Sequence, residues 1–70
     1  MKCREIRKYF IENDFEITEH TDTLGKVMIT AEPINPGIPT IRTKWMETRI
    51  DAFNSLLHKA LGLLKNNKNQ

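Results

Sequence analysis

Few side chains in this sequence could carry out acid–base, nucleophilic or metal chemistry. The chain has two histidines, His20 and His58, and one cysteine, Cys3. Neither histidine has an Asp or Ser neighbour at the spacing of a catalytic triad, and no His or Cys pair has the spacing of a zinc site. The three glycines lie too far apart to form a phosphate-binding loop. The sequence therefore predicts two solvated histidines and no catalytic, metal or cofactor site.

Charged side chains are more informative than motifs, because the two signs are separated along the chain. Residues 12–22 contain five acidic residues and no Lys or Arg. The candidate nucleic-acid contacts are the basic residues of the two segments on either side: Arg4, Arg7, Lys8, Arg42, Lys44 and Arg49. The net charge is only +2, from 11 basic and 9 acidic residues. Two interpretations remain open: a solvated surface of mixed sign, or an acidic hairpin that docks on a basic protein.

Length and composition limit the possible architectures. A chain of 70 residues forms one domain with a marginal core, which needs good packing or a partner. We expect this domain to span residues 1–65, followed by a disordered polar tail at residues 66–70. A single cysteine cannot form an internal disulfide, which favours a reducing, cytoplasmic setting. No segment has the apolar length of a signal peptide or of a membrane span, so no membrane association is expected.

The segment 48–64 gives the clearest structural signal, because its apolar residues recur with a helical period. The apolar arc centres on Ile50, Phe53, Leu57, Ala60, Leu61 and Leu64, and is widened by Ala52, Leu56 and Leu63. This arc covers roughly half of the helix, more than one packed face needs. Either the helix contacts both a sheet and a second helix, or the flank with Leu56 and Leu63 binds a partner. Thr48 is the expected N-cap, and Gly62 is expected to weaken the last turn.

The remaining elements are a first helix at 2–13 and three strands. Alternating apolar residues predict strands at 15–19, 26–31 and 40–46, and three prolines between 32 and 40 indicate a rigid loop. Two helices on one face of a three-stranded antiparallel sheet, in the order α-β-β-β-α, is the simplest α+β solution. The predicted core is Cys3, Ile6, Phe10, Phe15, Ile17, Val27, Ile29, Ile41, Trp45, Ile50, Phe53, Leu57, Ala60, Leu61 and Leu64. The predicted outer face of the sheet is Glu16, Thr18, Met28, Thr30, Arg42, Lys44 and Met46.

This order of elements resembles the double-stranded-RNA-binding domain. The spacing of Thr48-Arg49-Ile50-Asp51-Ala52 followed by Ala60-Leu61 is similar to the pattern of the second helix in that family. The resemblance implies RNA binding through a basic cluster at the start of that helix, where this chain has only Arg49. Small phage proteins of the ABA-sandwich kind are similar in layout. So are HicA-type mRNA-cleaving toxins, although this chain has Glu19-His20-Thr21 where they carry a Gly-Ser-His motif.

Three functions follow from these observations. The first is a small non-enzymatic interaction module, of the kind that phages and mobile elements encode. It would bind another protein, or itself as a homodimer, through a surface near Trp45 and the residues Met28, Met46, Leu56 and Leu63. The alternative is duplex RNA or DNA binding through the six basic residues named above. The third is RNA cleavage that uses His20.

Overall fold

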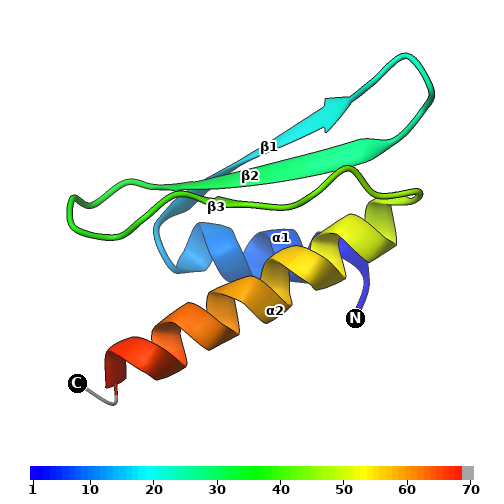
Figure 1. Cartoon of the computed structure of the whole chain (residues 1–70). Helices are drawn as coiled ribbons and strands as arrows, with labels where there is room; N and C mark the ends of the chain where they lie inside the picture. Colours follow the sequence, from blue (N-terminus) through cyan, green and yellow to red (C-terminus); the bar gives the residue numbers. More distant parts are fainter. Residues whose placement is uncertain (69–70) are drawn as a thin grey trace.

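The computed structural model describes the backbone of residues 1–68 and the side chains of residues 1–63. Its elements are α1 (Cys3–Glu12), β1 (Phe15–Thr21), β2 (Val27–Pro33), β3 (Ile41–Arg42) and α2 (Arg49–Lys68). The strands form one antiparallel sheet in the order β1-β2-β3. Both helices lie on the same side of this sheet, and the other side is open (Figure 1). The predicted α+β architecture is therefore confirmed.

Helix α1 ends in a short turn that feeds the chain directly into β1. The Asn13 side-chain amide donates to the Tyr9 carbonyl at 2.7 Å and closes the last turn of the helix. Asp14 then adopts a φ of 64°, a left-handed conformation that is uncommon outside glycine but tolerated by Asp. The Ile34 N–H donates to the Asp14 carbonyl at 2.9 Å, so the turn is joined to the far end of β2.

The hairpin of β1 and β2 is longer than the sequence predicted. Its register runs from Phe15 opposite Pro33 to Thr21 opposite Val27. The Asp22 carboxylate accepts the N–H groups of Leu24 and Lys26 at 2.9 and 2.8 Å, and Gly25 has a φ of 83°. This Asx-type turn satisfies its own backbone, so the strands extend up to Asp22 and start again just after Lys26.

A bulge after β3 overturns two predictions. Residues 42 and 46 pair with residues 30 and 27, so three residues of the third strand stand against two of β2. The Ile29 N–H donates to the Thr43 hydroxyl at 3.0 Å, where a regular ladder would use a carbonyl. One extra residue reverses the alternation of side chains. Trp45, predicted to cap the core, is therefore 45% exposed, and Met46, predicted on the open face, packs against the core.

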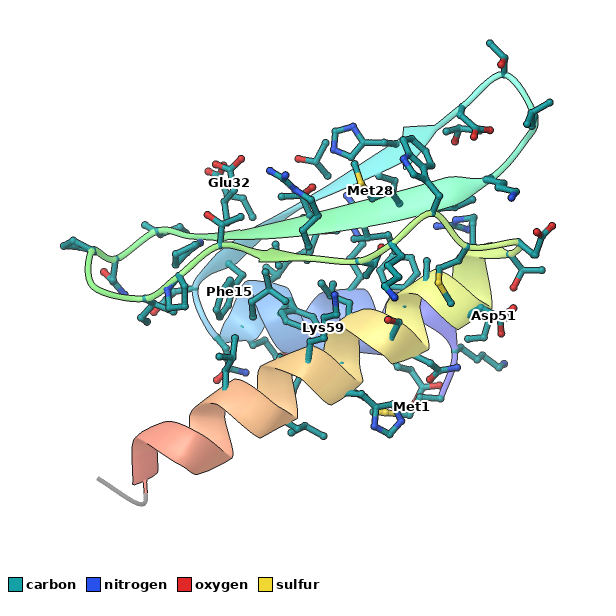
Figure 2. The ribbon with its side chains drawn as sticks, viewed as in Figure 1. Met1, Phe15, Met28, Glu32, Asp51 and Lys59 are labelled. Atoms are coloured by element: carbon teal, nitrogen blue, oxygen red, sulfur yellow. The ribbon has the colours of Figure 1, made fainter. Side chains whose placement is uncertain are left out.

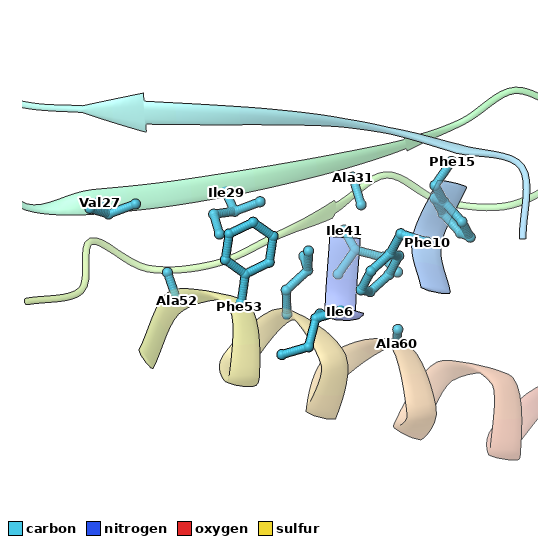
Figure 3. Close-up of a cluster of buried hydrophobic side chains, with 11 residues drawn as sticks. Ile6, Phe10, Phe15, Val27, Ile29, Ala31, Ile41, Ala52, Phe53 and Ala60 are labelled. Carbon is cyan, nitrogen blue, oxygen red and sulfur yellow. The ribbon is translucent and has the colours of Figure 1, made fainter. Parts of the chain in front are cut away.

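The core lies between the sheet and the two helices (Figure 3). It consists of Ile6, Phe10, Phe15, Val27, Ile29, Ala31, Ile41, Ala52, Phe53, Leu56 and Ala60. Phe10 is its aromatic centre, with Tyr9 and Phe15 in edge-to-face contact at ring separations of 5.5 and 5.6 Å. Cys3, Ile17 and Leu57, which the sequence placed in the core, are only partly buried against it.

Helix α2 is rotated relative to the orientation that the sequence predicted. Its buried line is Ala52, Phe53, Leu56 and Ala60, whereas Ile50 and Leu61, predicted to be buried, are exposed. The apolar arc was wide enough to allow either orientation, and contact with α1 as well as with β2 and β3 selects this one. Leu56, proposed as a partner contact, is fully buried and cannot bind a partner. The side chain of Leu64 lies outside the described residues.

The ends of α2 confirm one expectation and correct another. The Asp51 N–H donates to the Thr48 hydroxyl at 3.2 Å, so Thr48 is the N-cap. The helix then continues past Gly62 to Lys68, so the glycine does not end it. Residues 66–68 are thus helical, contrary to the expected tail, and residues 69–70 lie outside the described part. Across the described residues, no helix is both long and apolar enough to cross a membrane.

Candidate interaction surface

The open face of the sheet carries a row of three large side chains, His20, Met28 and Trp45, called the Trp45 patch below. His20 and Met28 are direct cross-strand partners in the hairpin. Because Met46 pairs with Val27 and packs inward, Trp45 points to the same side as Met28. Figure 2 shows Met28 and Glu32 on the side of the sheet away from the helices. The bulge therefore brings the only tryptophan of the chain onto the open face.

His20 has one polar side-chain contact in the described part of the chain. Its Nε2 lies 3.3 Å from the Thr30 hydroxyl, and both residues are at least half-buried between neighbouring strands. His58 is exposed on α2, and the Cys3 thiol is half-buried near the start of α1. Within the residues described, His, Cys, Asp and Glu do not gather in a group of three or more that could hold a metal ion.

The six basic residues predicted to contact nucleic acid do not form one surface. Arg4 and Lys8 are exposed on α1, beneath the sheet, and Lys8 is paired loosely with Glu12 at 3.8 Å. Arg42 and Lys44 are exposed along the third strand. Arg7 and Arg49 are both held by the carboxylate of Glu19. Of the six, Arg42 and Lys44 lie in the segment 41–46, which also carries the exposed indole of Trp45.

Glu19 joins α1, β1 and α2 in an ion-pair cluster that sequence inspection missed. Its carboxylate accepts from Arg49 at 2.6 and 3.0 Å and from Arg7 at 3.0 Å. The Arg49 guanidinium also lies over the Phe53 ring, 5.7 Å from its centroid. The sequence did contain a signal for this position of Glu19. Side chains alternate along a strand, so Glu19 points to the same side as the inward-facing Phe15 and Ile17.

The charges of this cluster shift the titration of its members. The hydrogen bond from Arg49, followed by the positive charges of Arg49 and Arg7, lowers the pKa of Glu19 although partial burial opposes the shift. The same hydrogen bond raises the pKa of Arg49. Arg7 and Arg49 therefore tie the two helices to the sheet through Glu19, which offsets part of their positive charge.

A small apolar pocket lies at the far end of the molecule, between the proline-rich loop and the two helices. Tyr9, Asn13, Ile38, Pro39 and Leu63 are among its walls, and its cavity volume is about 20 Å³. That volume holds about one water molecule, so the pocket is a packing gap and not a ligand site. Leu63, predicted as a partner contact, lines this pocket, and no residue of the Trp45 patch does so.

The predicted protein interface is thus only partly assembled by the fold. Met28 is on the open face beside Trp45, whereas Met46 is turned toward the core and Leu56 is buried within it. Comparisons with protein-family models, with curated proteins and with solved structures found no match. The geometry of the open face and the edges of the sheet therefore carries the functional argument.

Proposed function

We propose that this protein is a small non-enzymatic interaction module that binds another protein through the open face of its sheet. The observation that carries the proposal is the exposure of Trp45 beside Met28. An indole left 45% exposed on a small domain leaves a large apolar area in contact with water. Trp is the residue type most enriched among the energetic centres of protein interfaces, and Met adapts to irregular partner surfaces.

The surroundings of the Trp45 patch support a protein partner. Thr18, Thr30 and Arg42 adjoin the patch on the same face of the sheet, so that hydroxyl and guanidinium groups surround its apolar centre. This arrangement of an apolar centre with a polar rim is typical of protein interfaces. Met28 and His20 are half-buried between neighbouring strands, which restricts their side-chain freedom and so lowers the entropy lost on binding.

Replacement of Trp45 by Ala tests this proposal. Purified protein is immobilised and used to capture partners from a lysate, and each captured partner is titrated against wild type and variants. We expect W45A to weaken binding by about 2 kcal/mol, as expected for an energetic centre. Leu24→Ala is the matched control, because Leu24 is an exposed apolar residue in the hairpin turn. Equal affinity of wild type and W45A for every captured partner would refute the proposal.

A second candidate function is nucleic-acid binding on the same open face. Arg42 at the end of β3 and Lys44 just after it are exposed next to Trp45 in the chain, and an exposed aromatic ring near basic residues can stack on a base. Fluorescence anisotropy with labelled duplex RNA, duplex DNA and a single strand, at low and near-physiological salt, tests this candidate. Salt-sensitive binding that is lost in R42Q/K44Q and kept in R4Q/K8Q would support it.

A further inference from the structure

The two edges of the sheet differ in how they are protected against pairing with another strand. On the β3 edge, Pro39 precedes the strand, Thr43 forms the bulge, and the Lys59 ammonium donates to the Arg42 carbonyl at 2.7 Å. Proline, a bulge and charged side chains, lysine above all, are the usual devices that block an edge. The β1 edge runs through seven residues, FEITEHT, without proline, lysine or a bulge. Its inward-facing charge, Glu19, is paired with Arg7 and Arg49 of the same chain. Among the described residues, no strand pairs with the outer side of β1.

The backbone groups that β1 presents at this edge follow from the printed hydrogen bonds. The Asp14 carbonyl accepts from Ile34 of the opposite chain segment at 2.9 Å, and the Asp22 N–H donates to Lys26 at 3.0 Å. Even-numbered residues therefore direct their N–H and C=O groups toward β2. Because these groups alternate along a strand, the odd-numbered residues of β1 direct theirs outward. Phe15, Ile17, Glu19 and Thr21 form a ready-made row of donors and acceptors.

We propose that the β1 edge is a self-association site, at which β1 of a second copy pairs in antiparallel orientation to give a continuous six-stranded sheet. This inference rests on the proposed role of the protein as an interaction module and names one partner, a second copy of this chain. The self-association site uses the β1 edge of the sheet, whereas Trp45 follows β3 at the opposite edge. The two surfaces therefore have different centres, and they meet at His20 and Thr18 of β1.

One polar pair on β1, Glu16 with His20, favours a second copy as the partner and sets the register. In a two-fold pairing centred on Thr18, all seven residues of β1 find a partner, and Thr18 faces its own copy. Glu16 then faces His20 of the second copy on the open side of the sheet, and His20 faces Glu16. An imidazole N–H donates to a carboxylate whether the ring is neutral or protonated. The pairing also brings a donor close to Glu16, whose cross-strand neighbour within the monomer is the like-charged Glu32.

The helix side of the same edge offers an apolar contact. Arg7 of α1 reaches Glu19 of β1, which shows that this side of α1 faces β1. Ile11 lies one turn along on the same side and is 54% exposed. Two-fold pairing of the β1 strands brings α1 of the two copies toward each other with Ile11 between them. The isologous geometry closes the assembly at two copies, because the β3 edges that remain are blocked.

Analytical ultracentrifugation of the full chain, from micromolar to millimolar concentration, tests the proposal. We expect the wild type to sediment as a monomer–dimer equilibrium. Thr18→Lys places two lysines opposite each other and should weaken the dimer by about tenfold or more, a change of about 1.4 kcal/mol. Thr23→Lys, in the exposed hairpin turn, is the matched control and should dimerise as the wild type does. Circular dichroism confirms that the variants are folded.

A charge swap tests the register. Residues 16 and 20 lie about 13 Å apart along one strand, so they cannot pair within a monomer. Glu16→Lys and His20→Glu should each weaken the dimer, and the double variant E16K/H20E should restore it. Failure of the double variant to restore the dimer overturns the register centred on Thr18. A wild type that stays monomeric at millimolar concentration overturns the self-association site, yet it leaves the W45A-sensitive capture of other proteins unaffected.

Discussion

At the scale of single residues, Glu19 joins the parts of this protein that are far apart in the sequence. Its carboxylate binds Arg7 of α1 and Arg49 of α2, while its own backbone belongs to β1. The bidentate contact with Arg49 has the geometry in which a surface ion pair contributes most. Two of the six basic residues predicted to contact nucleic acid, Arg7 and Arg49, are therefore engaged in contacts within the fold.

The lowered pKa of Glu19 makes part of the folding stability depend on pH. Because this pKa is lower in the folded chain than in the unfolded chain, the stabilisation is fully present above the unfolded pKa of about 4.3. It is lost as the pH falls from there through the lower folded pKa. We expect Glu19→Gln to lose about 0.5–1 kcal/mol at neutral pH, with a difference from wild type that shrinks at acidic pH.

Urea denaturation at a series of pH values, at one protein concentration, measures this effect. Glu12→Gln is the control, because Glu12 forms a single exposed ion pair with Lys8 at 3.8 Å and should contribute less. If the difference between wild type and E19Q is the same at neutral pH and at about pH 2, well below the ordinary glutamate pKa of about 4.3, the ion-pair cluster does not stabilise the protein.

At the scale of elements, the bulge at Thr43 decides which side chains the sheet presents on each face. The Thr43 hydroxyl accepts from the Ile29 N–H at 3.0 Å and donates to the Lys44 carbonyl at 2.9 Å. This hydroxyl takes the place of the backbone carbonyl that a regular ladder would use. The Thr43 N–H still donates to the Ile29 carbonyl at 3.0 Å. The consequence is that Met46 turns inward and Trp45 turns outward, which creates the Trp45 patch.

Thr43→Val should therefore destabilise the protein more than such a small change in side-chain shape suggests. Valine has nearly the same shape but cannot accept a hydrogen bond, which leaves the buried Ile29 N–H without a partner at a cost of about 1–3 kcal/mol. Thr30→Val is the matched control, because Thr30 is also buried but its hydroxyl only contacts His20 at 3.3 Å. Chemical denaturation measures both variants, and equal losses would mean that the Thr43 hydroxyl does not hold the bulge.

At the scale of the whole molecule, one layer of helices covers one face of a small sheet, and the orientation of α2 determines how much apolar surface is buried. Leu56 and Ala60 face α1 and the sheet, while Leu61 is 48% exposed on the other side of α2. The chain measures 40 × 20 × 19 Å, elongated along α2, whose last turns extend beyond the sheet (Figure 1). A core this small leaves little stability to lose.

Leucine-to-alanine substitutions distinguish the observed orientation of α2 from the one that the apolar arc predicted. Leu56→Ala creates a cavity in the core and should cost about 2–5 kcal/mol, a large part of the stability of a small domain. Leu61→Ala removes an exposed side chain and should change the stability by less than about 0.5 kcal/mol. Denaturation followed by circular dichroism measures both, and a larger loss for L61A would show that the helix is rotated as the sequence suggested.

The sequence by itself determined the type and order of every element and the N-cap at Thr48. These features depend on local periodicity and on hydrogen bonds between near neighbours, which a chain carries without its tertiary contacts. Only the tertiary structure decided the rotation of α2, the exposure of Trp45 and the joining of Arg7 and Arg49 by Glu19. An apolar arc of half a helix fits several orientations, and packing against α1 and the sheet selects one. A bulge formed by one threonine hydroxyl leaves no periodic signal, and an ion pair between residues 30 positions apart exists only after the chain has folded.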